Sequence, residues 1–174
     1  LEAFKPGALT RWNWAPHGGD GRCAALELQA WMPAETNAVC LRFTRLPGNH
    51  GRPVPTQAEV RLTVRLDLED RSHHAETEAN EGLKGHFRDH VRPLEGLAGF
   101  AFKPAPERVL HAWVSSGSYH SEPEWCLGIP HPHEGSRGQR DRGDAWSPGW
   151  FELVLAEGES VLLTLNAEAA DPSL

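Results

Sequence analysis

Histidine and acidic residues gather in one polar segment of the C-terminal half. The run His131-Pro132-His133-Glu134 places two imidazoles two residues apart, and on an extended segment both would point to the same side. A carboxylate beside two imidazoles is a set of donors that zinc accepts. Zinc sites need three or four converging ligands, however, and no other spacing in the sequence requires convergence here. We therefore interpret this run as a solvated loop, and we predict no metal ligand and no cofactor.

Paired carboxylates are the second chemistry that the residue types allow. Five acids lie near one another in the same region: Glu122, Glu124, Glu134, Asp141 and Asp144. A glycosidase needs two carboxyl groups held about 5 to 10 Å apart across a cleft, and closeness within a loop does not establish that separation. A nucleophilic site is not indicated either, because the sequence has no Gly-x-Ser-x-Gly elbow. We predict no catalytic residue on this chain alone.

Seven tryptophans accompany a single tyrosine. Their flat rings could stack on sugars or pack within sheets, and the packing interpretation is favoured. Trp12 and Trp14 share one face of a polar segment, whereas Trp146 and Trp150 flank the Ser147-Pro148-Gly149 turn. The exposure of these four side chains decides between the two interpretations.

Strands are the elements that must position these residues. In residues 59–68 apolar and polar side chains alternate, which predicts a strand with one wet face. The same alternation in residues 26–32 and 39–43 predicts a hairpin. It recurs in residues 150–155 and 160–165, which we expect to form a second hairpin joined by a short glycine-containing loop.

Two polar stretches interrupt the strands. Between Val64 and Phe100 we expect a long connection that could hold a short helix. Residues 128–148 are too irregular for a sheet, which predicts a long loop that is either functional or disordered. About eight short strands with frequent turns favour an all-β fold, an antiparallel β-sandwich with little or no helix. A single-sheet barrel is the alternative, because periodicity does not determine how a sheet closes.

Composition bounds the partners. The 174 residues carry a formal charge of −7, which disfavours nucleic acid and anionic lipid. No apolar run is long enough for a membrane helix and the start does not resemble a signal peptide, so we expect a cytoplasmic location and no membrane partner. Three separated cysteines fit reduced packing residues better than a disulfide framework.

Motifs in the C-terminal third resemble a known family. They are Trp125, His133-Glu134, Ser136-Arg137-Gly138, Asp141-Arg142-Gly143-Asp144 and Trp146-Ser147-Pro148-Gly149-Trp150-Phe151. In the N-terminal domain of bacterial and archaeal glycogen debranching enzymes of the amylo-α-1,6-glucosidase type, an aromatic, an acid, Arg-Gly, a further acid and Pro-Gly-x-Phe similarly precede the last strands. Upstream, Asp70-Arg71-Ser72-His73 is similar to a family element in which the arginine precedes the acid, so the order here is reversed.

The resemblance covers residues 11–166 and implies a supersandwich-like β-sandwich that is fused, in the whole enzyme, to an (α/α)6 barrel bearing the catalytic carboxylates. We therefore expect residues 1–174 to be a single β-sandwich domain, a fragment of a larger glycoside hydrolase that lacks this catalytic domain. Its implied role is accessory, shaping or docking onto the barrel. The implied partners are a glycogen-like α-glucan and the missing catalytic domain, and an autonomous carbohydrate-binding module is the alternative.

The candidates for glycan contact or for the interface are Arg71, His73, Trp125, Glu134, Arg137, Asp144, Trp146 and Trp150. Two of them have specific expected contacts within the loop or with sugar. Arg137 and Asp144 would either pin the loop by charge-assisted hydrogen bonds, which we favour, or reach toward sugar hydroxyls.

Overall fold

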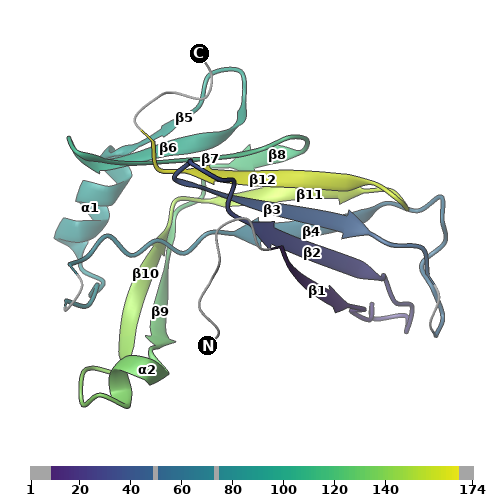
Figure 1. Cartoon of the computed structure of the whole chain (residues 1–174), viewed down its shortest axis with the longest axis horizontal. Helices are drawn as coiled ribbons and strands as arrows, with labels where there is room; N and C mark the ends of the chain where they lie inside the picture. Colours follow the sequence, from purple (N-terminus) through teal and green to yellow (C-terminus); the bar gives the residue numbers. More distant parts are fainter. Residues whose placement is uncertain (1–8, 49–50, 73–74, 169–174) are drawn as a thin grey trace.

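The computed structural model describes residues 9–48, 51–72 and 75–168. Over those residues the chain forms three antiparallel sheets and two short helices (Figure 1). The largest sheet has seven described strands, in the spatial order β1 (Thr10–Trp14), β2 (Leu26–Trp31), β3 (Ala38–Arg45), β12 (Ser160–Asn166), β7 (Arg108–Val114), β6 (Ala98–Ala105) and β5 (Val91–Pro93). The predicted all-β fold with little helix is confirmed.

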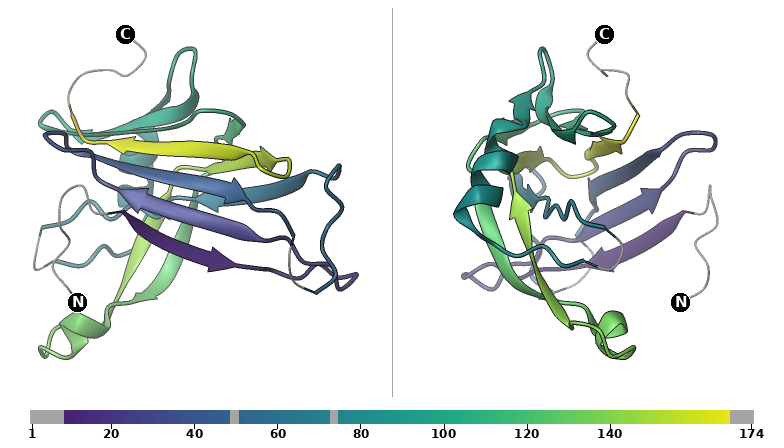
Figure 2. Two further views of the ribbon diagram at one scale, coloured as in Figure 1. Left: turned by 45° about the vertical axis from the view of Figure 1, so that its right-hand side comes forward. Right: turned by 90° about the vertical axis from the view of Figure 1, so that its left-hand side faces the viewer.

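A smaller sheet packs against the large one, and a two-stranded ribbon extends away from both (Figures 1 and 2). The small sheet has the order β4 (Val60–Arg65), β11 (Trp150–Leu155) and β8 (Ser118–His120). The ribbon pairs β9 (Glu124–Pro130) with β10 (Arg142–Ser147). Helix α1 (Glu81–Asp89) precedes β5, and the single turn of α2 (Pro132–Gly135) lies at the tip of the ribbon.

Period-two alternation builds the core between the two larger sheets. On β11 the side chains of Phe151, Leu153 and Leu155 are fully buried, and β4 sets Val64 opposite Phe151 and Leu62 opposite Leu153. Directly opposed residues share a face, so one apolar layer of the small sheet meets the inner face of the large sheet. The sheets do not close on themselves, and the fold is a sandwich rather than the alternative barrel.

The predicted hairpin of residues 26–32 and 39–43 is confirmed, because β2 pairs with β3 and sets Leu28 opposite Phe43. The second expected hairpin is wrong. Strand β11 pairs with β4 and β8, whereas β12 pairs with β3 and β7 in the other sheet. The loop of residues 156–159 therefore crosses between the sheets. The apolar faces of both strands point into the core from opposite sheets. A hairpin within one sheet would show the same alternation, so the sequence pattern does not distinguish the two arrangements.

The prediction that residues 128–148 are too irregular for a sheet is wrong at both ends of the stretch, because β9 runs to Pro130 and β10 covers Arg142–Ser147, whereas residues 131–141 form the tip of the ribbon with α2. The register shifts between Gly143 and Ala145, and Gly128 on the opposite strand has φ +68°. A bulge of this kind interrupts the alternation of side chains, which hides the strand from a search for period two.

The connection between the sheets includes the short helix that the sequence allowed. Asn80 caps α1 by accepting a hydrogen bond from the backbone N–H of Leu83 at 2.8 Å. Phe87 on this helix is buried, and its ring lies 5.2 Å from Phe102 and 5.6 Å from Trp146. The helix therefore covers the junction between the large sheet and the ribbon.

Candidate functional site

The family-like residues converge where the connection from β4 to α1 runs along the ribbon. Strand β4 ends at Arg65, three residues before the end of the alternating run, and Leu68 instead pairs with Trp146 through two backbone hydrogen bonds of 2.9 Å. Farther along, the N–H of Asp144 donates to the carbonyl of Thr77 at 2.9 Å. The connection is thus fastened to β10 at Leu68 and at Thr77.

Asp144 joins three segments. Its carboxylate accepts hydrogen bonds from the backbone N–H of Ala79 at 2.8 Å and of Gly128 at 2.9 Å. These two bonds favour the ionised form and lower the pKa of Asp144 below its ordinary value. Asp144, on β10, therefore holds the connection and strand β9 against its own strand.

Trp125 and Trp146 face each other across the ribbon. Trp146 is only 1% exposed, and Trp125 is half-buried with its ring 6.2 Å from that of Phe87. In this arrangement Trp146 is a core residue and offers no surface to a sugar.

Trp150 lies on the opposite side of the small sheet from the core. Its ring stacks on the imidazole of His120, with centroids 3.9 Å apart, and its indole N–H donates to Glu122 at 3.0 Å. The half-buried ring is therefore covered on one face by a side chain of the same sheet.

Glu134 and Arg137 lie at the tip of the ribbon, in and just after α2. Arg137 is exposed and makes no side-chain hydrogen bond or ion pair with the described residues, so the structure does not show it pinning the loop. Glu134 is half-buried, and its charge helps to raise the pKa of Arg71. His73 lies outside the described residues.

Arg71 belongs to a charged cluster at the base of α2. Its Nε donates to Glu69 at 2.5 Å, and its terminal nitrogen donates to the carbonyl of Ala75 at 2.7 Å. The hydrogen bond that Arg71 donates to Glu69 is the main cause of the raised pKa of Arg71. The other oxygen of Glu69 contacts Nε2 of His131 at 3.1 Å, and Nδ1 of that ring lies 3.0 Å from Glu76.

The sequence argument singled out His131 but missed both of these glutamates. His131 and His133 do not converge, since His133 is exposed whereas His131 is half-buried among the acids. Glu69 follows directly after the alternating run of β4, and Glu76 lies in the polar connection. No local spacing signals that these two meet a histidine more than 50 residues away, because only the pairing of the connection with β10 brings them together.

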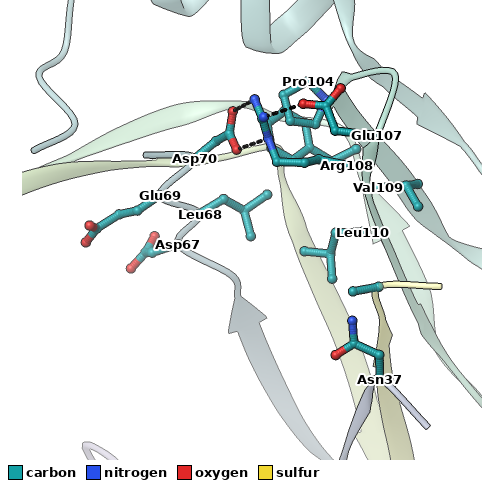
Figure 3. Close-up of a pocket in the computed structure, with 12 residues that line it drawn as sticks. Asn37, Asp67, Leu68, Glu69, Asp70, Pro104, Glu107, Arg108, Val109 and Leu110 are labelled. Carbon is teal, nitrogen blue, oxygen red and sulfur yellow. Dashed lines mark hydrogen bonds and ion pairs between the residues drawn. The ribbon is translucent and has the colours of Figure 1, made fainter. Parts of the chain in front are cut away.

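A cavity of about 440 Å³ opens on the other side of this connection (Figure 3). Arg108 lies between Asp70, which it contacts through two nitrogens at 2.9 and 3.1 Å, and Glu107 at 2.7 Å. Asp67 and Glu69 add two further acids to the lining. Carboxylates of this kind accept hydrogen bonds from hydroxyl groups, but none of the eight candidate residues lines the cavity.

Two other tryptophans are the exposed ones. Trp12 is 50% exposed and Trp14 is 38% exposed, on β1 at the free edge of the large sheet (Figure 2). The register sets Trp14 opposite Leu26, a core residue, and Trp12 opposite Leu28. Both rings therefore extend the inner, apolar face of the sheet beyond the part that the small sheet covers.

Comparison with known proteins agrees with the motifs. A family model described as the N-terminal domain of glycogen debranching enzyme matches residues 1–162. A search of curated proteins found no match. The described residues contain no helix that is both long and apolar enough to cross a membrane. With a family match over nearly the whole chain and an antiparallel β-sandwich fold, this chain belongs to the family of glycogen debranching enzyme N-terminal domains.

Proposed function

We propose that this chain is the non-catalytic accessory domain of a glycogen debranching enzyme and that it docks onto the catalytic domain of the same polypeptide through β1. The observation that carries the proposal is the exposure of Trp12 and Trp14 on the inner face of the large sheet. Inner faces are normally covered, and an apolar face left open at a sheet edge is typical of an interaction surface.

The energy available to such a docking face is substantial. The exposed half of one tryptophan is on the order of 100 Å², and its burial contributes about 2 to 3 kcal/mol. Two adjacent rings at the edge of an apolar layer could therefore anchor a second domain. In this proposal the substrate of the whole enzyme is a glycogen-like α-glucan whose α-1,6 bonds are hydrolysed by the other domain.

We also propose a cytoplasmic location. It is supported by the sequence, in which three widely separated cysteines fit reduced packing residues better than a disulfide framework.

Hydrogen exchange tests the docking. It would be measured on the isolated chain and on the full polypeptide encoded by the reading frame that contains it. We expect the amides of Thr10–Trp14 to exchange more slowly in the full polypeptide, with no change in β8, which lies in the small sheet. Equal exchange of β1 in both proteins, or a reading frame without a catalytic domain, would contradict the proposal.

A glycan-binding module is the second candidate, and the same two rings favour it. Trp12 and Trp14 are two residues apart on one strand, so their faces lie about 7 Å apart on one side and could form a platform for sugar rings. Titration of the isolated chain with maltoheptaose separates the two functions. Binding at micromolar to millimolar concentration that is lost in W12A would favour the module.

A further inference from the structure

The cluster of Glu69, Glu76 and His131 lies apart from the docking face and has an unusual balance of charge. Two glutamates from the connection between β4 and α1 face one imidazole from the start of α2. The side chain of Glu76 is only 9% exposed and that of His131 is 11% exposed. Burial removes water from these groups, so their charges must be compensated within the protein.

Two atoms of the cluster have no hydrogen-bond partner among the described residues. Oε2 of Glu76 and Nδ1 of His131 are 3.0 Å apart, but they are not oriented for a hydrogen bond, and both atoms are buried. A neutral imidazole carries one proton, so it can donate to Glu69 or to Glu76 but not to both. Either way, one ring nitrogen would direct its lone pair toward a carboxylate oxygen.

Arg71 forms an ion pair with only one of the two acids, although its charge also acts on Glu76 from farther away. Its bond to Oε2 of Glu69 and its second bond to the carbonyl of Ala75 hold the guanidinium on the outer side of the cluster. The inner oxygen of Glu69 remains directed at His131, and Glu76 has no ion pair with an arginine or lysine of the described residues. A cation at the centre of the cluster would remove this imbalance.

We propose that Glu69, Glu76 and His131 bind a divalent transition-metal ion of the zinc type. One imidazole nitrogen and two carboxylates are donors that such ions prefer. The three ligand atoms lie within 4.8 Å of one another, and small side-chain rotations would bring each to a bond of roughly 2.0 to 2.2 Å. Arg71 then orients Glu69 from outside, as partners of metal ligands commonly do.

The backbone around the site leaves room for this arrangement. A Cβ on Gly143 would lie 2.8 Å from both Oε2 of Glu76 and Cε1 of His131, so glycine lets β10 pass this close without displacing either side chain. The ion would connect the segment that carries Glu69 and Glu76 to the base of α2 and fix the tip of the ribbon. Its proposed role is structural, and it does not depend on the docking function of β1.

Calorimetric titration of the metal-stripped chain with zinc chloride tests the site. We expect one equivalent to bind with a Kd on the order of micromolar or tighter, and the Tm to rise on binding. E76Q, which keeps the shape of the side chain, should weaken binding by about tenfold or more, and H131A should abolish it. Circular dichroism of E76Q without metal would show that its fold is intact.

H133A is the matched control, because it removes an exposed histidine two residues away and should bind zinc as the wild type does. Absence of binding and of any change in Tm would overturn the proposal, and the cluster would then be a protonated imidazole between two carboxylates. Equal losses in H133A and H131A would also overturn it, since they would indicate adventitious binding to the loop. No glucan or catalytic domain enters this experiment, so its failure would leave the proposed docking untouched.

Discussion

At the residue scale, Asp144 carries the most specific structural role among the family-like residues. One carboxylate accepts from the backbone of Ala79 and of Gly128, which belong to different segments. In D144N the amide can accept through one oxygen only, and the charge is lost. We expect the free energy of unfolding to fall by about 1 to 2 kcal/mol at pH 7, measured by urea denaturation, because Asp144 is only partly buried.

The pH dependence of that difference follows from the direction of the pKa shift. The pKa of Asp144 is lowered in the folded state, so its contribution is complete above its ordinary value of 3.8 and is lost as the pH falls through the lowered pKa. The gap between wild type and D144N should therefore be constant above about pH 5 and shrink below 3.8. D141N, at an exposed neighbouring acid, should show neither effect, and a gap that does not shrink at all as the pH falls below 3.8 would contradict the assignment.

At the scale of elements, the turn from β10 into β11 depends on Gly149. A Cβ at this position would lie 2.1 Å from the carbonyl oxygen of His120, a backbone atom that cannot move without disturbing β8. We expect G149A to lower the free energy of unfolding by about 2 kcal/mol or more and to broaden signals from β8 in NMR spectra.

Gly85 in α1 is the matched substitution, since a Cβ there would meet nothing within 4 Å and the residue is helical. G85A should raise the free energy of unfolding by about 0.5 to 1 kcal/mol. Similar losses in G149A and G85A would show that the contact with His120 is not what makes Gly149 necessary.

Much of each strand could be predicted from the sequence, but not which strand it pairs with. Alternation identified the inward residues of β11 and β12 correctly, because period two depends only on the local backbone. It placed them in one hairpin, since a face does not specify a partner strand. The inward series of β3 continues past Phe43 to Arg45, a buried arginine that donates to the carbonyl of Pro55 at 2.8 Å, and a polar residue at such a position cannot be recognised locally.

The residues of the candidate site likewise fall into those that local sequence could identify and those that only long-range strand pairing brings together. Asp144 and Trp146 were singled out because a family-like motif surrounds them in sequence, and the structure places Trp146 in the core. Glu69 and Glu76 were missed because their meeting with His131 depends on the long-range pairing of Leu68 with Trp146. The bulge at Gly143 further concealed β10, so the ribbon that holds His131 at its tip was interpreted as a loop.

At the scale of the whole molecule, the two kinds of tryptophan separate folding from association. Trp146 is 1% exposed and packs against Phe87 and Phe102, so W146A should lower the free energy of unfolding of the isolated chain by about 3 to 5 kcal/mol. Trp12 and Trp14 are 50% and 38% exposed at the open edge, so the double variant W12S/W14S should lower it by clearly less than W146A does, because about half of each ring already lies in water.

In the full polypeptide the same double variant should behave differently, because the proposed interface would bury both rings. We expect its domains to unfold at a lower temperature than in the wild type and in separate calorimetric transitions, whereas W150A, at a ring on the outer side of the small sheet, should leave the coupling of the domains intact. If W12S/W14S instead destabilised the isolated chain as strongly as W146A does, the rings would belong to the sandwich core itself. Their exposure would then have no bearing on a partner domain, and the inner face of the large sheet would be complete without one.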